Sequence, residues 1–258
     1  MRVTFLGTGA AGGVPLWGCT CAACRLAQQQ RQRVRRPCSA LLEAAGTRVL
    51  IDAGLTDLHE RFAPGSLDAI VLTHYHPDHV QGLFHLRWGK GRPITVYGPP
   101  DREGCGDLFK NAGLLQFVTV HEHEPFRIGA LRWTPLPLIH SKPTYGYAIE
   151  APEQVRFAYL TDTRGLPSPT TRFLHGWGTF DLAIDCTFPP AASPKNHNDW
   201  NAAIACKAQV GARACWLTHI SHTLDDWLLG ERPEMPAGVQ VAHDGLRVDL
   251  PRPAPGTP

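Results

Sequence analysis

Short apolar runs recur along the whole chain and are separated by glycine, proline and small polar residues. Runs of this length that are rich in branched and aromatic side chains are typical of strands. The pattern predicts strands at 2–6, 39–44, 47–53, 69–73, 94–98, 131–136, 145–151, 155–162, 182–188, 214–220 and 246–250. The segment EAAGTRVL also predicts a β-hairpin that turns at Gly46.

Helical patterns lie between some of these runs, at 21–33, 102–112, 168–174, 198–210 and 224–229. Strands and helices alternate late in each half of the chain, whereas hairpin-like pairs open each half. This order predicts an α/β fold with mixed sheets. No repeat or low-complexity linker interrupts residues 1–250, so we expect a single domain there. The closing stretch PRPAPGTP, residues 251–258, is expected to be a disordered tail.

Composition and charge narrow the classes of partner. The 258 residues carry a net charge of only +2, which gives no general basic field for nucleic acid. There is no signal-peptide pattern and no apolar stretch of the roughly 18 residues that span a bilayer, so we expect a cytoplasmic protein without a membrane partner. Eight cysteines in that compartment predict metal ligands or buried thiols rather than disulfides. The oligomeric state stays open, with a homodimer as one expectation.

The stretch LGTGAAGG, residues 6–13, places Gly7, Gly9 and Gly12 in the spacing of a dinucleotide-binding turn. That fingerprint requires a following helix and an acidic residue about twenty positions later. The chain continues instead into VPLWGCTCAAC, where Pro15 and Gly18 oppose a helix, and then into QQQRQR. The context therefore argues against a dinucleotide site.

The segment VLTHYHPDHVQG delivers four potential metal ligands directly after an apolar run: His74, His76, Asp78 and His79. Imidazole suits zinc, iron and manganese-type ions, and a carboxylate adds a hard ligand. Side chains alternate along an extended segment, so His74 and His76 share one face. Asp78 and His79 follow on a turn and point elsewhere, so the run can serve two metals.

Three further runs end in a similar residue: His140 in LPLIHSK, Asp162 in AYLTDTRG and His219 in CWLTHISH. Taken singly, each is better explained as a core histidine or a capping aspartate. Together with the first motif they complete a set of seven potential ligands. The sequence therefore predicts a metal site at the strand ends.

These seven residues resemble the ligand set of the metallo-β-lactamase superfamily. The resemblance covers nearly the whole chain and implies an αβ/βα four-layer sandwich with two mixed β-sheets and two divalent metals at one edge. It implies a first metal held by His74, His76 and His140, a second held by Asp78, His79 and His219, and Asp162 as the bridge. We count Asp78 among the catalytic residues as well.

The resemblance also assigns supporting roles. Asp52 in LIDAG matches an aspartate behind the site that orients a ligand histidine. The opening glycine loop resembles the first turn of the subgroup that includes the tRNA 3′-processing enzymes. Its glycines would let the backbone pass close to the metal edge.

A second motif, DCTFPP followed by KNHNDW, contains Asp185 at a strand end and His197 before a helix. The phosphodiesterase branch of the superfamily pairs an acidic residue and a histidine at such positions. An alkoxide leaving group must be protonated, and a histidine with a pKa of about 6.5 can donate that proton while a carboxylate holds it. The alternative is that His197 caps a surface helix beside Asn198 and Asp199.

A third motif, WGCTCAAC, contains Cys19, Cys21 and Cys24. A structural zinc needs four nitrogen or sulfur ligands, and this zinc knuckle at 19–24 supplies three. His222, three residues after His219, is the candidate for the fourth. A redox pair or buried thiols remain alternatives. The remaining cysteines match no metal motif and are expected in the core or in neutral positions: Cys38, Cys105, Cys186, Cys206 and Cys215.

Together with HSKPTYGY and THISH, these motifs resemble the phosphodiesterases that open 5-phosphoribosyl 1,2-cyclic phosphate to ribose 1,5-bisphosphate in phosphonate breakdown. The resemblance implies manganese-type metals in the dinuclear site, zinc in the cysteine site and a small-molecule cyclic phosphate ester as substrate, with 2′,3′-cyclic nucleotides as further substrates. A second phosphate needs a cation, for which Lys142 and Arg87 are candidates.

Three other functions stay open. A tRNA 3′ endonuclease would use the same metals, but it would need a long arm or a basic surface that the sequence does not show. A nonenzymatic binding protein like the PqqB carrier-type proteins would share the cysteine knuckle. A thioesterase or lactonase would need less help from an acid than the Asp185 and His197 pair offers.

Overall fold

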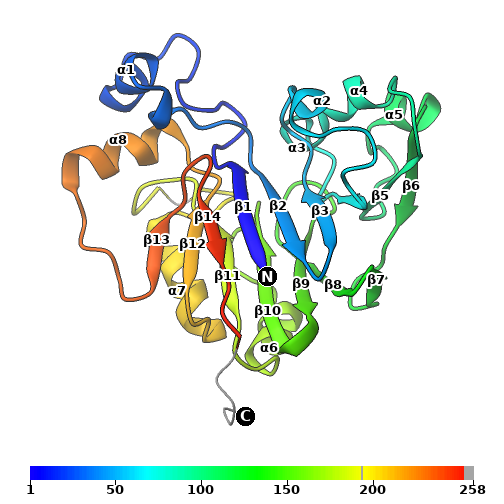
Figure 1. Ribbon diagram of the computed structural model, residues 1–258. Coiled ribbons are helices and arrows are strands. Elements are labelled where there is room, and N and C mark those ends of the chain that lie inside the picture. The colour runs from blue at the N-terminus through cyan, green and yellow to red at the C-terminus, as the bar shows by residue number, and fades with distance from the viewer. Residues whose placement is uncertain (193, 253–258) are drawn as a thin grey trace.

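Two seven-stranded mixed sheets pack face to face in the computed structural model, which describes residues 1–192 and 194–252 (Figure 1). The first sheet has the order β14-β1-β2-β3-β4-β5-β6, with β1 Arg2–Gly7, β2 Ser39–Ala44, β3 Thr47–Ile51, β4 Ala69–Val71, β5 Ile94–Gly98, β6 Leu115–Thr119 and β14 Arg247–Asp249. The second has the order β13-β12-β11-β10-β9-β8-β7, with β7 Phe126–Ile128, β8 Leu131–Pro137, β9 Tyr145–Ala151, β10 Val155–Leu160, β11 Asp181–Asp185, β12 Cys215–Thr218 and β13 Val239–Val241.

Each sheet changes from antiparallel to parallel pairing along its order. β1 to β3 pair antiparallel and β3 to β6 pair parallel. β7 to β10 pair antiparallel and β10 to β13 pair parallel. The β2–β3 hairpin turns through Ala45 and Gly46, whose φ angles are 48° and 75°, as a two-residue hairpin turn requires. The predicted mixed sheets and the hairpin at Gly46 are confirmed.

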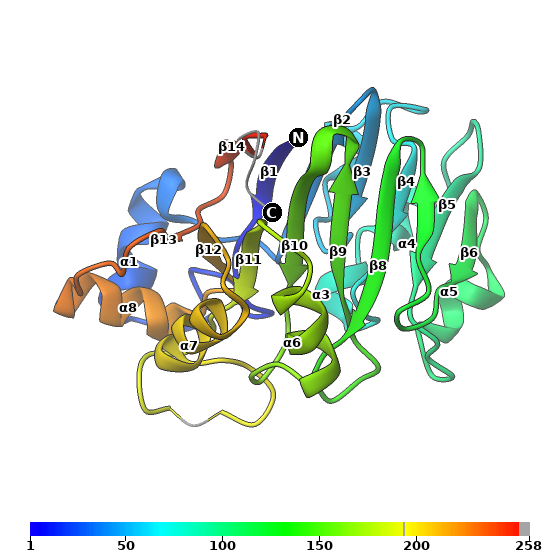
Figure 2. The ribbon, with the colours of Figure 1, turned by 90° about the horizontal axis from the view of Figure 1, so that it is seen from below.

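Helices cover the outer faces of both sheets and complete four layers (Figures 1 and 2). Those beside the first sheet are α2 Leu58–Arg61, α3 Pro77–Val80, α4 Leu83–Leu86 and α5 Gly106–Lys110; those beside the second are α6 Ser168–His175 and α7 Trp200–Val210. α1 Ala22–Gln29 and α8 His222–Glu231 pack against each other at one end, and two short 3₁₀ turns are η1 Arg31–Arg33 and η2 Pro152–Gln154. The predicted αβ/βα four-layer sandwich is confirmed.

The alternation of side chains along the strands explains the layers. In β3, Val49 and Ile51 point into the core between the sheets, which contains Trp133, whereas Leu50 points outward to Leu58 under the helices. Residues two apart share one face of a strand, so a strand with apolar residues on both faces must be covered on both. Each fully buried side chain of this size stabilises the fold by about 1.5–3 kcal/mol.

The strands missed by the sequence pattern lie at the sheet edges, and the missed helices are the one-turn helices α2, α3 and α4. β6, β7 and β13 end their sheets, and most residues of β6 are exposed or half-buried, so their apolar signal is weak. The helix expected at 21–33 ends at Gln29, and the one expected at 102–112 shortens to α5. Residues 253–258 of the expected tail lie outside the described residues. No helix in the described part of the chain is long and apolar enough to cross a membrane.

Candidate metal centre and active site

The candidate ligands lie where strands of both sheets end. His74 and His76 follow β4, His140 follows β8, Asp162 follows β10 and His219 follows β12. Strand ends in open α/β sheets are where ligands usually bind. The backbone turns sharply there, because Asp162 and His219 have φ angles of 61° and 60°, in the left-handed region that few non-glycine residues adopt.

The first group of side chains surrounds one carboxylate oxygen. His74 Nε2 lies 2.8 Å from His76 Nδ1, which lies 3.0 Å from His140 Nε2. Asp162 Oδ2 lies 3.7 Å from His74 Nε2 and 3.6 Å from His140 Nε2. The ligand atoms of all four residues lie within 4.8 Å of one another, so one ion can contact them all.

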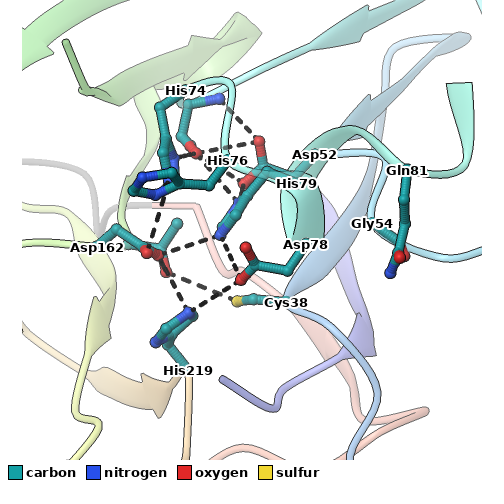
Figure 3. Close-up of polar contacts among 12 residues, drawn as sticks. Cys38, Asp52, Gly54, His74, His76, Asp78, His79, Gln81, Asp162 and His219 are labelled. Carbon is teal, nitrogen blue, oxygen red and sulfur yellow. Dashed lines mark hydrogen bonds and ion pairs between the residues drawn. The ribbon is translucent and has the colours of Figure 1, made fainter. Parts of the chain in front are cut away.

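The second group surrounds the other oxygen of the same carboxylate. Asp162 Oδ1 lies 3.4 Å from both His79 Nε2 and His219 Nε2. Asp78 Oδ2 lies 3.3 Å from His79 Nε2 and 3.7 Å from His219 Nε2. Asp162 therefore faces both groups, one through each oxygen, and occupies the position between the histidines in Figure 3. The structure brings together all seven predicted ligands; this set is called the histidine–aspartate cluster below.

The cluster fits two divalent metal ions. The Nε2 atoms of His79 and His219 are buried and have no hydrogen-bond partner among the described residues. An unpaired buried polar atom is costly, and a bound cation would remove that cost. Imidazole nitrogens with carboxylate oxygens are suitable ligands for zinc, manganese and iron. We therefore expect the first ion at His74, His76, His140 and Asp162, and the second at Asp78, His79, His219 and Asp162.

Hydrogen bonds behind the cluster fix the orientation of the histidines. Asp52 Oδ2 lies 2.8 Å from His79 Nδ1, and Asp52 Oδ1 accepts a bond of 2.8 Å from the amide of Thr73. The Nδ1–H of His79 therefore donates to Asp52, which leaves Nε2 directed at the metal position. This contact is the one expected for Asp52 from the sequence (Figure 3).

Two residues that support the cluster had no recognisable signal in the sequence. A Cβ atom at Gly54 would overlap the carbonyl of Asp78, so only glycine lets this backbone support the ligand loop. Thr187 Oγ1 lies 2.9 Å from His219 Nδ1 and donates a bond of 2.7 Å to Asp185 Oδ1. Thr187 thus connects a metal ligand to the candidate acid pair.

Asp185 and His197 lie in contact, as the sequence predicts. His197 Nδ1 lies 2.8 Å from Asp185 Oδ2, which also accepts the amide of Thr163 at 2.9 Å. The His197 ring stacks on His219 with centroids 4.9 Å apart, and its side chain is 20% exposed, whereas Asp185 is fully buried. Asp199, not His197, caps α7, because its side chain accepts from Ala202 N. His197 therefore stands beside the cluster with one nitrogen held by a carboxylate and the other available.

Burial and the neighbouring charges shift the pKa values of the cluster's side chains in opposite directions for several residues. Burial lowers the pKa of His74 and of His76. For His219 burial acts in the same direction, but Asp162 and Asp78 outweigh it and raise the pKa to about 9. Burial alone would raise the pKa of Asp162, but the neighbouring histidines hold it well below its usual range. Protons thus compensate the carboxylates when no metal is bound, and metal binding would release them.

The cysteine cluster, Cys19, Cys21, Cys24 and His222, also forms as predicted. His222 Nδ1 lies 3.3 Å from Cys19 Sγ and 3.7 Å from Cys21 Sγ. Backbone amides point at two of the sulfurs: Leu16 N donates to Cys24 Sγ and Cys24 N donates to Cys21 Sγ. Three thiols and one imidazole with such donors fit a four-coordinate zinc ion. Of the remaining cysteines, Cys105 is half-buried and the others are buried: Cys38, Cys186, Cys206 and Cys215.

The two candidate substrate cations are each paired with a carboxylate. Lys142 Nζ lies 3.1 Å from Asp101 Oδ2, whose side chain is 4% exposed. Arg87 lies 2.7 Å from a carboxylate oxygen of Asp107 in α5, and its guanidinium also lies over the ring of Trp88. The structure therefore does not bring Arg87 to the cluster, and Lys142 holds the loop that contains Asp101.

The glycine loop has two roles. A Cβ atom at Gly7 would overlap the carbonyl of Pro37, so this glycine permits close packing of two backbone segments. Gly12 and Gly13 line a pocket together with His197 and His219. The first half of the loop also lies at the candidate metal edge, because Thr8 O and Ala10 N hydrogen-bond to Ile220, the residue after His219. The expectation that the glycine loop passes close to this edge is therefore met.

Comparisons with known proteins agree with this architecture. A family model described as a beta-lactamase superfamily domain matches residues 47–220. An octanoyltransferase of Porphyromonas gingivalis is 30% identical over 263 residues, which cover 95% of this chain and 51% of that protein. A ribonuclease Z of Methanopyrus kandleri is 32% identical over 121 residues, or 44% of this chain and 43% of that protein. The chain thus spans about half the length of the first relative and less of the second.

Two solved structures are similar along nearly their whole length. A diphosphatase from the PhnP family is 30% identical with a TM-score of 0.77, covering 96% of this chain and 97% of that one. The zinc-bound PqqB of Methylobacterium extorquens is 26% identical with a TM-score of 0.73, covering 97% of this chain and 100% of that one. The converging histidine, aspartate and cysteine side chains of this chain form groups that could hold metal ions. The chain belongs to the beta-lactamase superfamily.

Proposed function

We propose that the protein is a dinuclear-metal phosphodiesterase that hydrolyses a small cyclic phosphate ester. The candidate substrates are 5-phosphoribosyl 1,2-cyclic phosphate, which would yield ribose 1,5-bisphosphate, and 2′,3′-cyclic nucleotides. The similarity to a PhnP-family structure supports this class. The observation that carries the proposal is the pair of Asp185 and His197 beside Asp162, with His197 Nδ1 4.0 Å from Asp162 Oδ2.

This pair supplies what an alkoxide leaving group needs. Asp185 holds His197 through Nδ1, so Nε2 is the atom that can carry the proton to be delivered. The ring centroid of His197 lies 5.0 Å from that of His140 and 4.9 Å from that of His219, so His197 adjoins both groups of ligands. General acid catalysis of this kind contributes about a hundred- to ten-thousand-fold to the rate.

Two divalent cations would complete the site. Manganese-type ions in the histidine–aspartate cluster would neutralise phosphate charge and make water more acidic. Zinc is the ion proposed for the cysteine cluster. The chain's own contribution is to position these ions through the seven ligands, to orient His79 through Asp52 and to protonate the leaving oxygen through His197.

A diphosphate substrate is the second candidate, because the similar PhnP-family structure is that of a diphosphatase. Its leaving group would be a phosphate, which is far less basic than an alkoxide and depends less on an acid. The two substrates therefore differ in how strongly they should depend on His197. A nonenzymatic role like that of a PqqB-type binding protein would not depend on turnover at all.

The test is the variant His197→Ala, assayed by phosphorus NMR on the manganese-loaded protein with both cyclic esters. We expect kcat to fall by about a hundredfold or more while elemental analysis finds the same metals as in the wild type. His121→Ala removes an exposed histidine elsewhere and serves as the matched control.

Three other results would each change the assignment. Loss of metal in the His197→Ala variant would make His197 a ligand instead of an acid. Turnover of a diphosphate that survives the variant would favour the diphosphatase. Wild-type protein that holds all its metals and hydrolyses neither ester would reject the phosphodiesterase.

A further inference from the structure

We infer that Cys38 and Thr161 are positioning residues that hold the Asp162 carboxylate in its place between the two groups of ligands. Cys38 lies directly before β2 of the first sheet, and its fully buried thiol points across to the second sheet, towards Asp162 (Figure 3). This inference rests on the proposed function in one respect, because it requires two divalent ions at the histidine–aspartate cluster. It adds the residues that fix the carboxylate shared by those ions.

Thr161 makes the contact that fixes the carboxylate. Its side chain is fully buried directly after β10, and its hydroxyl donates a hydrogen bond of 3.0 Å to Asp162 Oδ1. Apart from the ligand histidines, no other side chain in the described part of the chain hydrogen-bonds to this carboxylate. A carboxylate rotates over a broad range about its last side-chain bond, so the bond from Thr161 favours the orientation in which Oδ1 faces His79 and His219.

The direction of the hydrogen bond between Cys38 and Thr161 follows from the number of hydrogens available. A hydroxyl has one hydrogen to donate, and an ionised carboxylate only accepts. Thr161 gives its hydrogen to Asp162, so its oxygen is the acceptor in the second contact that it makes. That contact joins Thr161 Oγ1 to Cys38 Sγ at 3.7 Å, and the thiol of Cys38 is therefore the donor.

The sulfur of Cys38 in turn accepts two hydroxyl groups of the second sheet. Tyr159 Oη and Thr218 Oγ1 each lie 3.2 Å from Sγ, and both side chains are fully buried. Among the residues that the structure describes, neither hydroxyl has another hydrogen-bond partner, so each donates to the sulfur. Because a buried hydroxyl without a partner is costly, an apolar side chain at position 38 would leave both hydroxyls in an unfavourable state.

These contacts form a chain of hydrogen bonds that ends at Asp162 Oδ1, and each bond in such a chain polarises the next. Thr161 and Thr218 directly precede the ligands Asp162 and His219. The Cys38 thiol therefore joins the ends of β10 and β12, the two strands of the second sheet that supply ligands to the second ion. Since Oδ1 faces the second group, we expect the affinity for this ion to depend most on the network.

The experiment titrates metal-free protein with Mn²⁺ and follows binding by calorimetry. Thr161→Val keeps the branched shape and removes the hydroxyl, and we expect one of the two ions to bind about tenfold more weakly. Thr161→Ser keeps the hydroxyl and removes the methyl group, so it should bind both ions as the wild type does. Thr170→Val removes a buried hydroxyl that donates to the carbonyl of Pro137; it is the matched control and should leave the titration unchanged.

Cys38→Ala tests whether the thiol acts through Thr161. It removes the donor to Thr161, and we expect the same ion to bind roughly threefold more weakly, a smaller loss than in Thr161→Val. The double variant should bind Mn²⁺ no more weakly than Thr161→Val alone, because the thiol then has no hydroxyl to act on, whereas two independent effects would add. Cys206→Ala removes a buried thiol in α7, outside the network, and should leave the titration unchanged.

Wild-type affinity in Thr161→Val, or an equal loss in Thr161→Ser, would overturn the role of the Thr161 hydroxyl. Additive losses in the double variant would overturn the role of Cys38. If Cys38→Ala did not fold, Cys38→Ser would replace it, because the smaller oxygen cannot bridge the 3.7 Å to Thr161. A wild-type protein that takes up no Mn²⁺ at the cluster would reject the metal site of the proposed function itself, which is a different result from an unchanged variant.

Discussion

The histidine–aspartate cluster takes its side chains from strand ends in both sheets and from the short helix α3, whereas three of the four groups in the cysteine cluster come from residues 19–24, which lead into α1. The strand ends are far apart in the sequence, and only the packing of the two sheets brings them together. The cysteine loop needs one distant contact, from His222 at the start of α8. One site is assembled by the whole fold, and the other fastens a loop to a helix.

The two clusters also differ in burial and in support. His74 and His79 have no exposed side-chain surface, and Asp52 and Thr73 hold His79 from behind. In the cysteine cluster only Cys24 is buried, and the thiols receive a few backbone amides. The first site should therefore keep its shape without metal, while the second should depend on its metal for local order.

The largest effect is expected from Asp162→Asn, because this carboxylate faces both groups of ligands. Asparagine keeps the size and tolerates the left-handed backbone found there, so the fold should survive. We expect both active-site metals to be lost and activity to fall by about a thousandfold or more, since bound metals contribute several kcal/mol to the rate. Elemental analysis measures the loss of metal, and circular dichroism checks that the fold is preserved.

Asp185→Asn is the matched control, because it removes an equally buried carboxylate that faces His197 instead of both groups of ligands. It should lower activity while both metals remain. If Asp162→Asn kept one metal at full occupancy, Asp162 would serve one group only and would not be the bridge.

A smaller effect is expected from Asp52→Asn. Its carboxylate fixes the orientation of His79 and does not point at the metal position. Outer-sphere partners of this kind are typically worth about ten- to a hundredfold in metal affinity. We expect weaker binding of one metal, measured by titration of metal-free protein, and recovery of activity at high metal concentration.

Asp57→Asn changes a nearby carboxylate that pairs with Arg61 and should leave the titration unchanged. If activity in Asp52→Asn did not recover when the metal concentration was raised, Asp52 would act on the chemistry and not on metal binding.

The contrast between the clusters also explains what the sequence could predict. The ligands stand out because histidine and aspartate interrupt apolar runs at strand ends, so all seven could be named and the mixed sheets inferred. Gly54 and Thr187 could not, because their role exists only through contacts with Asp78, His219 and Asp185. Edge strands such as β6 could not be predicted either, because an exposed strand does not need the apolar pattern that identifies a buried one. Lys142 and Arg87 lie near the ligands in the sequence, but proximity in sequence does not reveal the carboxylates that bind them.

The smallest effect on catalysis is expected from Cys19→Ser. This variant tests whether the cysteine cluster stabilises only its own surroundings. Cys19 is half-buried and its sulfur lies 3.3 Å from His222, so the change should remove any metal ion held by the cysteine cluster without disturbing the core. We expect one metal fewer per chain, a fall in Tm of roughly 5 °C and faster hydrogen exchange confined to the glycine loop and the knuckle. Activity should stay within about tenfold, because the seven ligands do not contact this loop's thiols.

Cys105→Ser, at a half-buried cysteine outside the cluster, should change neither metal content nor hydrogen exchange.

The decisive quantity in Cys19→Ser is the metal occupancy of the histidine–aspartate cluster. His219 and His222 lie three residues apart, so strain in the knuckle could reach the active site through that short segment. Asp162 holds His219 from another strand end, but Thr187, which also contacts His219, accepts hydrogen bonds from Ser221 at the start of α8. If the metal occupancy of the histidine–aspartate cluster nevertheless fell when the cysteine cluster lost its metal, the two clusters would form one cooperative unit.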